Sequence, residues 1–198
     1  DRCSAAVNSF AIDASGSVVV AGAQDGSLAV WKISDGKKIG AISGAHEGGV
    51  RAVAFLSPTC VVSAGADNTV RIWQVSADPR LRMLHRMAAG DAPLTAIAAW
   101  GQEGEAHQFL AAGGDDGTVY AWKANSLVSV EGEMRWVPTT VSHHLQGKEV
   151  AELSFRGDGA ALIAGSRDSR QLGGGEVRLF ETEHWTVVAS QPYSSHVV

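Results

Sequence analysis

The sequence predicts an all-β protein built from four repeats, each with four short antiparallel strands. Three observations lead to this fold class. An apolar run, a pair of small residues, an Asp-containing turn and an alternating run ending in an aromatic residue recur in this order four times. In the first three copies the turn Asp precedes a Trp by six positions. No segment favours a helix, and a fixed period outweighs local propensity in determining a fold.

The middle two strands of each repeat carry the clearest pattern. Their segments are Val18–Ile33, Val61–Val75, Leu110–Lys123 and Leu162–Phe180. The closing aromatics are separated by 42, 49 and 58 residues and are Trp31, Trp73, Trp122 and Phe180. The turn acids are Asp25, Asp67 and Asp116. Asp followed by a small residue is typical of tight turns, so each segment predicts a hairpin.

A first and a fourth strand complete each repeat. Alternating stretches precede the four hairpins at Val7–Ile12, Val50–Phe55, Leu94–Ala99 and Val150–Phe155. Further strands are predicted after the aromatics at Lys38–Ser43, Leu81–Met87, Met134–Val141 and Thr186–Ser190. Short strands at regular spacing, separated by turn residues, predict antiparallel sheets.

On these residues the chain resembles the WD40-repeat family, and the resemblance covers nearly its whole length. The second repeat, from Gly44 to Trp73, fits best. It has every member of the hydrogen-bonded tetrad that the family uses: His46, Ser63, Asp67 and Trp73. The other repeats depart from it, with Ala21, Ala112 and Ala164 at the Ser position and Phe180 at the last Trp position. We expect these repeats to depend more on packing.

The resemblance implies that each repeat is a blade of a β-propeller. We expect one WD40 segment over residues 1–198, with blades at about 6–44, 45–90, 91–142 and 143–191, and with residues 192–198 leading into a next blade. Because rings of this family usually have about seven blades, four in-phase repeats suggest an arc of a larger ring. The start at Asp1 without Met suggests an excerpt, in which targeting signals could be missing.

Charge and cysteine content narrow the function classes. The net charge is −5, and residues 91–141 alone carry −5, so overall positive charge does not favour nucleic-acid binding. Cys3 and Cys60 stand far apart, which argues against a disulfide framework or zinc site and favours a reducing, intracellular setting, cytoplasmic or nuclear. No apolar stretch approaches the roughly 20 residues that span a bilayer.

The loops that break the repeat are the candidate binding places. The resemblance implies that the loop before the first strand of a blade and the loop with the turn Asp share one face, called the top face here, and that the other two loops lie on the bottom face. In the fourth repeat both top-face loops are long, and the first of them is judged about two residues longer than its counterparts. Together they gather His143, His144, Lys148, Arg167 and Arg170. This rim would suit an acidic or phosphorylated partner. The alternative is that one His is the structural loop His and that the arginines are solvated.

Two further features have similar alternatives. Insertions on the bottom face of the third repeat bring Glu103, Glu105 and Glu131 together, either as solvated loops or as a docking patch for a basic segment. The fourth strand of the second repeat, with Arg80, Arg82 and Arg86, either protects a sheet edge or contacts an acidic partner.

No catalytic motif accompanies these loops. The sequence has no phosphate-binding loop and no nucleophile motif, and Asp115–Gly117 lacks the downstream ligands of a calcium loop. We therefore expect no cofactor, no metal and no small-molecule substrate. The family implies a non-enzymatic protein-interaction scaffold within a multi-subunit complex, although fold alone does not fix function. The alternative is a component of a ribonucleoprotein or chromatin-associated assembly that contacts nucleic acid through local basic patches.

Overall fold

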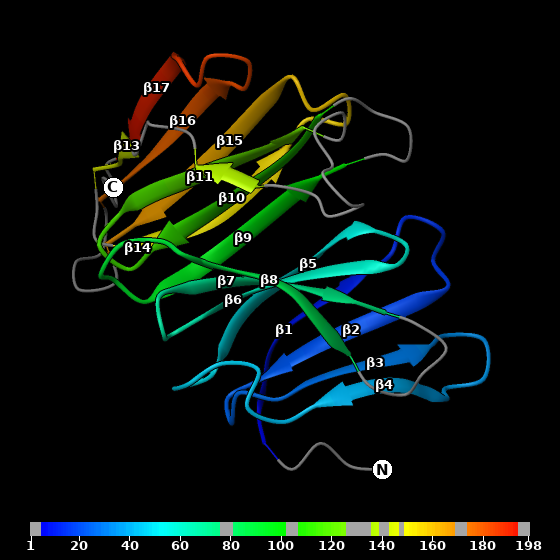
Figure 1. Cartoon of the computed structure of the whole chain (residues 1–198). Coiled ribbons are helices and arrows are strands. Elements are labelled where there is room, and N and C mark those ends of the chain that lie inside the picture. The colour runs from blue at the N-terminus through cyan, green and yellow to red at the C-terminus, as the bar shows by residue number, and fades with distance from the viewer. Residues whose placement is uncertain are drawn as a thin grey trace, which may run out of the picture. The chain divides into compact units, whose positions relative to one another are not determined.

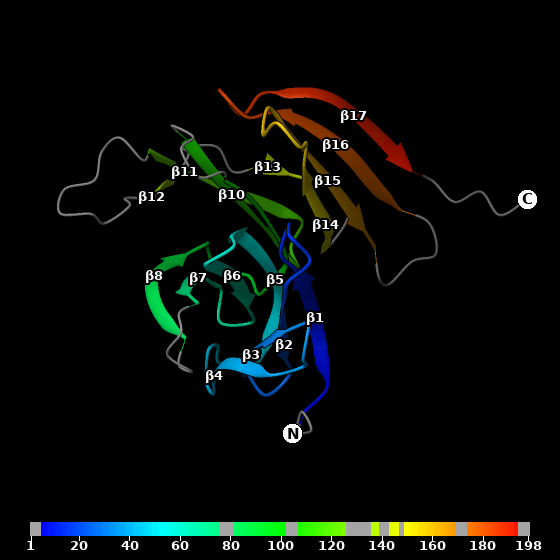
Figure 2. The same ribbon diagram turned by 90° about the vertical axis from the view of Figure 1, so that its right-hand side faces the viewer.

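A computed structural model describes residues 5–75, 81–101, 107–125, 136–138, 143–146, 149–168 and 174–193. Throughout these ranges the regular structure is β-strand, which confirms the all-β prediction. The strands form four antiparallel sheets, and in each sheet four strands follow one another in sequence order. The third sheet along the chain has a short fifth strand beside these four. Figures 1 and 2 show this order as four fans of neighbouring arrows. We number the sheets blades one to four along the chain.

The strand bounds lie within a few residues of those predicted. Blade one consists of β1 (Val7–Ile12), β2 (Val18–Ala23), β3 (Leu28–Lys32) and β4 (Lys38–Ile42). Blade two consists of β5 (Val50–Ser57), β6 (Cys60–Gly65), β7 (Thr69–Gln74) and β8 (Arg82–Ala88). Blade three consists of β9 (Leu94–Trp100), β10 (His107–Gly114), β11 (Thr118–Asn125) and β12 (Trp136–Pro138). Blade four consists of β14 (Glu149–Phe155), β15 (Ala161–Arg167), β16 (Gly175–Glu181) and β17 (Val187–Tyr193).

Strand pairing shows that the repeat extends to the register. The first strands of blades one, two and four each have an irregularity near their start, directly after Val7, Val50 and Val150. Counting from these residues, Ala21, Ser63 and Ala164 occupy one equivalent position, opposite the fourth residue of the first strand. The register therefore defines which residues of different blades correspond.

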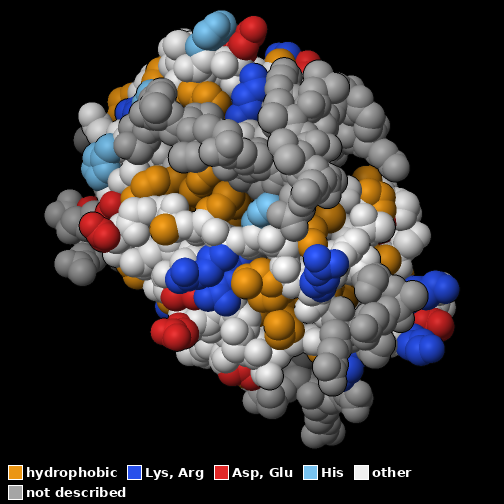
Figure 3. Space-filling model, in the orientation of Figure 1, with side chains coloured by type: hydrophobic (Ala, Val, Ile, Leu, Met, Phe, Trp, Pro, Cys, Tyr) orange, Lys and Arg blue, Asp and Glu red, His pale blue; other side chains and the backbone are white. Residues whose placement is uncertain are grey.

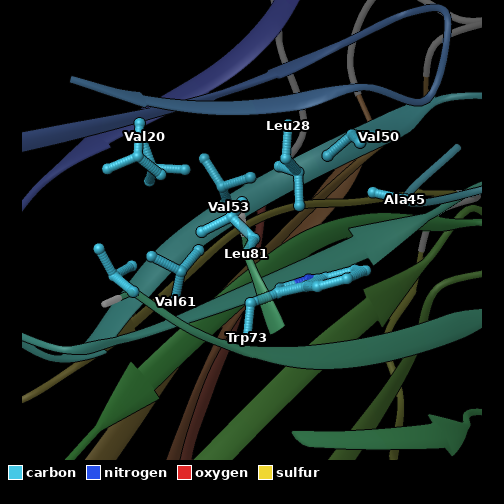
Figure 4. Close-up of a cluster of buried hydrophobic side chains, with 10 residues drawn as sticks. Val20, Leu28, Ala45, Val50, Val53, Val61, Trp73 and Leu81 are labelled. Atoms are coloured by element: carbon cyan, nitrogen blue, oxygen red, sulfur yellow. The ribbon is translucent and has the colours of Figure 1, made fainter. Parts of the chain in front are cut away.

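The chain divides into two compact units, residues 1–97 and 98–198. The core of the first lies between blades one and two (Figure 4). Val20, Leu28 and Val30 of blade one pack against blade-two residues that include Val53 and Trp73, and all five are at most 6% exposed. Burying each such aliphatic side chain contributes about 1.5–3 kcal/mol.

The second unit has an aromatic core between blades three and four. The Trp185 ring meets the rings of Phe109 and Phe155 edge-on, with centroids 6.0 and 6.4 Å away. Edge-to-face pairs of this kind are favoured by the ring quadrupole. Trp185 has a φ of 56°, a left-handed conformation that a bulky residue rarely adopts. The surrounding aromatic packing holds this turn in place.

One predicted boundary is wrong. The third and fourth repeats were separated before His143, but His143–His144 forms a short strand, β13, which pairs with Thr118–Val119 of β11. These two residues therefore belong to blade three, and blade four begins after them. The outer strand predicted at Met134–Val141 corresponds to β12, and the structure describes three residues of it.

In the part of the chain that the structure describes, no helix is long and apolar enough to cross a membrane.

Candidate functional site

The central polar feature of blade two is a chain of hydrogen bonds through its core. The Trp73 indole Nε1–H donates to Ser63 Oγ at 2.8 Å. Ser63 Oγ lies 2.7 Å from His46 Nε2, and His46 Nδ1 lies 2.8 Å from Asp67 Oδ1. Because the Asp67 carboxylate can only accept, the His46 proton lies on Nδ1, and Nε2 of the neutral ring accepts from the Ser63 hydroxyl. The four side chains that the sequence singled out thus meet in one network.

Asp67 anchors the outer end of this network. Its carboxylate also accepts bonds from Thr69 Oγ1 at 2.8 Å and from Arg71 Nη2 at 2.7 Å. Burial raises the pKa of Asp67, but the bonds from His46 and Thr69 outweigh it and hold the pKa below the usual 3.8. For His46 the balance is the opposite, because burial lowers its pKa below 6.5 despite the attraction of Asp67. At neutral pH the pair is a carboxylate beside a neutral imidazole.

Local sequence explains how these groups are positioned. Asp67 begins a tight turn in which Asn68 has a φ of 61°, and Gly26 and Gly117 take the same place after Asp25 and Asp116. Asn is one of the few non-glycine residues that tolerate this conformation. At Gly65, an added Cβ would lie 2.2 Å from His46 Nδ1. The imidazole therefore fits only because residue 65 has no side chain.

The other described blades lack the His. Ala45 N donates to Gly26 O just before His46, and equivalent backbone bonds run from Ala89 to Asn68 and from Leu145 to Gly117. His46 directly follows Ala45, so the residue that follows Ala89 and the residue that follows Leu145 occupy the position of His46 in the next two blades. They are Gly90 in blade three and Gln146 in blade four. Neither His143 nor His144 therefore stands at the position of His46, which was one interpretation of the sequence. The loop before blade four has the same length as the loop before blade two, whereas the sequence interpretation made it about two residues longer.

Blade four instead has a network that the sequence interpretation missed. Its centre is Glu176, which is 2% exposed and lies in register at the place of Thr69. Glu176 accepts from Arg178 Nε at 2.8 Å, from the Gln146 backbone N–H at 2.8 Å, and from Ser190 Oγ. Burial raises the pKa of Glu176, but these bonds hold it below its usual value. The sequence predicted that blade four depends more on packing than blade two does, but blade four also has a buried polar network of its own.

A signal for this network was present in the sequence. Ser166 stands at the place of Gly65, where a side chain is incompatible with a His ring. Its Oγ donates to the Gln146 carbonyl and accepts from the Glu176 backbone N–H at 3.0 Å. Blade four has Gln146 in place of His46 and Ser166 in place of Gly65, and it has a Glu two residues before Arg178. These three changes together indicate that another polar network replaces that of blade two.

The predicted top rim is only partly assembled. Arg167 makes a two-pronged ion pair with Glu149, with Nε–Oε2 and Nη2–Oε1 distances of 3.1 and 3.0 Å. His144 is exposed, and its carbonyl accepts from Arg178 Nη1. Lys148 and Arg170 lie outside the described residues. Arg167 is therefore an exposed cation already held by a carboxylate.

His143 does not belong to this rim. Its ring packs at a tilt against Phe180 of blade four with a centroid distance of 4.8 Å, and its Nε2 lies 2.9 Å from the Trp185 carbonyl oxygen. Pairing of β13 with β11 turns the side chain toward the core rather than toward solvent. His143 is a packing residue between two blades, which corrects its assignment to a binding surface.

The remaining candidates are less informative. Glu103, Glu105 and Glu131 of the predicted bottom patch lie outside the described residues. On β8, Arg82 and Arg86 are exposed next to the half-exposed Met83. Figure 3 shows basic and hydrophobic side chains gathered over β7 and β8.

One group of described residues has metal-ligand types close together: Glu181, Glu183 and His184. Glu183 and His184 are exposed, and their backbone N–H groups both donate to the Glu181 carboxylate. The bonds of this carboxylate are those of a turn cap, which explains the cluster without an ion.

Comparison with a family model identifies the repeat. The model described as "WD domain, G-beta repeat" matches residues 2–32, 36–74 and 90–123, just over half of the chain. Each segment ends within or at the end of the third strand of a blade, in blades one, two and three, and the second segment also contains β4 of blade one. Blade four, with Phe180 and the Glu176 network, lies outside the match.

Several curated proteins are similar to parts of the chain. The chain is 40% identical over 63 residues, 30% of its length, to "Ribosome biogenesis protein ytm1" of Aspergillus oryzae. It is 28% identical over 167 residues, 78% of its length, to "Periodic tryptophan protein 2 homolog" of Mus musculus. It is 35% identical over 107 residues, 53% of its length, to "WD repeat-containing protein 36" of Homo sapiens. The matches span 13%, 17% and 12% of these relatives' own lengths.

A solved structure supports the fold. The crystal structure of the computationally designed Ika4 protein superposes with a TM-score of 0.63 and covers 91% of this chain and 94% of its own, at 23% sequence identity. At this identity the similarity concerns the fold alone. The family model matches just over half of the chain, and this match shows that the chain belongs to the WD40 repeat family.

Proposed function

We propose that this chain is a non-enzymatic scaffold that binds other proteins within a multi-subunit complex. The observation that carries the proposal is the use of its buried polar groups. In both described networks, around Asp67 and around Glu176, the acids and bases bond to one another and to the backbone. Such satisfied networks stabilise blades and leave no acid or base directed at a substrate. Rigid blades then present variable loops for recognition.

The names of the relatives suggest which kind of complex. A relative named as a ribosome biogenesis protein supports a role in assembling ribosomal particles, where a WD40 scaffold would hold protein subunits together. This setting is intracellular and is compatible with the nucleus. The ribonucleoprotein alternative is favoured by one specific observation, the exposed Arg82 and Arg86 on β8. A phosphate backbone would be attracted to such cations.

We place the protein-binding surface at the top rim of blade four, around Arg167. Its guanidinium is held by Glu149 and its side chain is 64% exposed, so it is oriented yet accessible. Lys148 and Arg170 adjoin Glu149 and Arg167 in the sequence and would add charge. An acidic partner segment could share the guanidinium with Glu149, since Arg has five donors.

Affinity purification of the full-length protein under two treatments tests the proposal. We expect protein partners to remain bound after nuclease digestion, and we expect their affinity to fall only slightly at raised salt. Binding through about six phosphates would instead fall by about a thousandfold between 50 and 200 mM salt. Release of all partners by nuclease would favour the nucleic-acid alternative, and release by Arg82→Glu with Arg86→Glu would locate the contact on β8. Catalytic turnover of any substrate by the purified protein would refute the non-enzymatic assignment.

A further inference from the structure

The outer strand of blade two, β8, has an open edge. Within the described residues it pairs with β7 alone. Antiparallel strands exchange backbone hydrogen bonds at every second pair of residues. Because the Ala89 N–H donates to the Asn68 carbonyl, Ala89 and Met87 bond to β7, whereas Ala88 and Arg86 do not. The backbone N–H and C=O groups of Arg86 and Ala88 therefore point away from β7, toward the edge.

Two arginine side chains stand along this strand without a counter-charge. Arg82 and Arg86 are exposed, and neither has an ion-pair or hydrogen-bond partner in the part of the chain that the structure describes. Arg86 lies directly opposite Arg71 of β7, and like charges in this arrangement destabilise a sheet. Asp67 neutralises Arg71 at 2.7 Å, so the unbalanced charge is that of Arg86. A carboxylate brought to the edge would relieve the repulsion.

The outer strands of the other blades carry less charge. Among their described residues, β4 has one Lys, and β12 and β17 have no charged residue, although every residue of β17 is exposed. Charges on edge strands commonly prevent pairing with foreign strands. If the chain used charge for this purpose, the exposed β17 would need it most. Edge protection therefore does not explain the arginines of β8.

An exposed apolar side chain lies between the two arginines. Met83 is 47% exposed, and Figure 3 shows basic and hydrophobic side chains together over β7 and β8. A nucleic-acid backbone would supply phosphates to the arginines but would leave Met83 without an apolar contact. A second copy of β8 would bring further arginines to the same edge. An acidic polypeptide segment supplies both carboxylates and apolar contacts, so it fits this surface best.

We propose that the open edge of β8, with Arg82, Met83, Arg86 and Ala88, binds an extended acidic segment of another protein. The segment adds a short strand through backbone bonds to Arg86 and Ala88, places a carboxylate on each arginine, and contacts Met83 with an apolar side chain. An irregularity of pairing opposite Trp73 limits the length of the added strand, so Arg82 is reached by a side chain alone. The proposal does not depend on the rim of blade four.

Fluorescence anisotropy with a defined probe tests the contact on the full-length natural protein. The probe is a labelled peptide in which Glu and Val alternate over the seven-residue length of β8. Arg82→Glu with Arg86→Glu should weaken binding at least about tenfold, because carboxylates then face carboxylates. Lys32→Glu with Lys37→Glu makes the same change of charge on exposed residues of blade one and should alter binding by less than about twofold. Equal losses, or no binding to the natural protein, would overturn the proposal.

Two N-methylated peptides test the backbone bonds separately from the charges. A residue opposite Arg86 in an added antiparallel strand exchanges both of its backbone bonds with Arg86. A Glu at this place directs the Glu N–H groups toward β8 and the Val N–H groups away from it. Methylation of the Glu amides should therefore weaken binding at least about tenfold, and methylation of the Val amides by less than about twofold. Equal effects of the two peptides would refute strand addition.

Three further measurements distinguish other occupants and the other surface. A single-stranded RNA of the same net charge should need at least about tenfold higher concentration than unlabelled peptide to displace the probe. Displacement at equal concentration would assign the edge to nucleic acid. Sedimentation should be the same for the natural protein and Arg82→Glu with Arg86→Glu, and a dimer in the natural protein alone would assign the edge to a second copy. Arg167→Glu should leave probe binding unchanged, and a loss would move the site to the rim of blade four.

Discussion

At the scale of single residues, Ser63 shows how one hydroxyl satisfies two buried side chains. It accepts the Trp73 N–H and donates to His46 Nε2, and it is itself 0% exposed. Blades one, three and four have Ala at this position, and the residue at the place of His46 is Gly90 in blade three and Gln146 in blade four. The hydroxyl is therefore needed only where a His ring and a Trp indole must both be paired in the core.

Ser63→Ala should lower the free energy of unfolding by about 1–3 kcal/mol, because two buried polar atoms lose their partner. Chemical denaturation followed by Trp fluorescence measures the change. Ser34→Ala is the control, since Ser34 is exposed, and should shift stability by under about 0.5 kcal/mol. Equal effects of the two substitutions would show that the network contributes nothing measurable.

The protonation of His46 predicts a pH dependence. Burial lowers its pKa below 6.5, so between 6.5 and that lower value the unfolded chain binds a proton that the folded chain does not. Stability should therefore fall as pH decreases through about 6.5. Asp67, whose pKa is below 3.8, adds a second loss when pH falls through its folded pKa. Unfolding free energies measured from pH 8 to pH 5 isolate the His46 contribution.

His46→Gln, which introduces the residue that blade four has, should flatten this dependence. His184→Gln changes an exposed His and should leave the slope intact. A slope unchanged by His46→Gln would mean that another group titrates.

How far the sequence predicts the site depends on the residue. The His46 network was predictable because each member stands at the spacing that the repeat prescribes. The Glu176 network was harder to predict, because Glu176 stands where blade two has Thr69. Its mark in the sequence is the loss of the His and the Gly of blade two, and not a spacing that the repeat prescribes. His143 was misplaced for a related reason. Sequence shows a polar residue near a loop, but only strand pairing shows that its side chain points inward.

At the scale of elements, the two networks are alternative ways of closing the same corner of a blade. Blade two combines His46 with Gly65, and blade four combines Gln146 with Ser166. The strands themselves were predictable from alternating apolar residues and Asp turns. Their outer ends were less so, because edge strands face solvent and carry a weaker apolar pattern, as the fully exposed β17 shows.

The pairing of residues 46 and 65 predicts non-additive mutations. Gly65→Ser alone should destabilise by about 1–3 kcal/mol, because its Cβ overlaps the His46 ring. His46→Gln removes the ring, so the double variant should be more stable than the sum of the single effects predicts, by at least about 0.5 kcal/mol. A double-mutant cycle by chemical denaturation measures this coupling. Additive effects would show that the ring and residue 65 do not interact.

At the scale of the whole molecule, the chain consists of two compact units, and each contains its own core between two blades. Repeat proteins derive most of their stability from contacts between neighbouring repeats, so a defect in one interface need not spread through the chain. The period predicted this modular organisation, while the number of blades in a complete ring stays a prediction.

Trp73 and Phe180 provide a matched test of this independence, because they occupy the same position in blades two and four and are 1% and 0% exposed. Either change to Ala should cost about 3–5 kcal/mol by leaving a cavity. In hydrogen exchange, Trp73→Ala should reduce protection of β1 to β8 and leave β14 to β17 nearly unchanged, and Phe180→Ala should do the reverse. Loss of protection throughout the chain in both variants would show that the two units unfold as one.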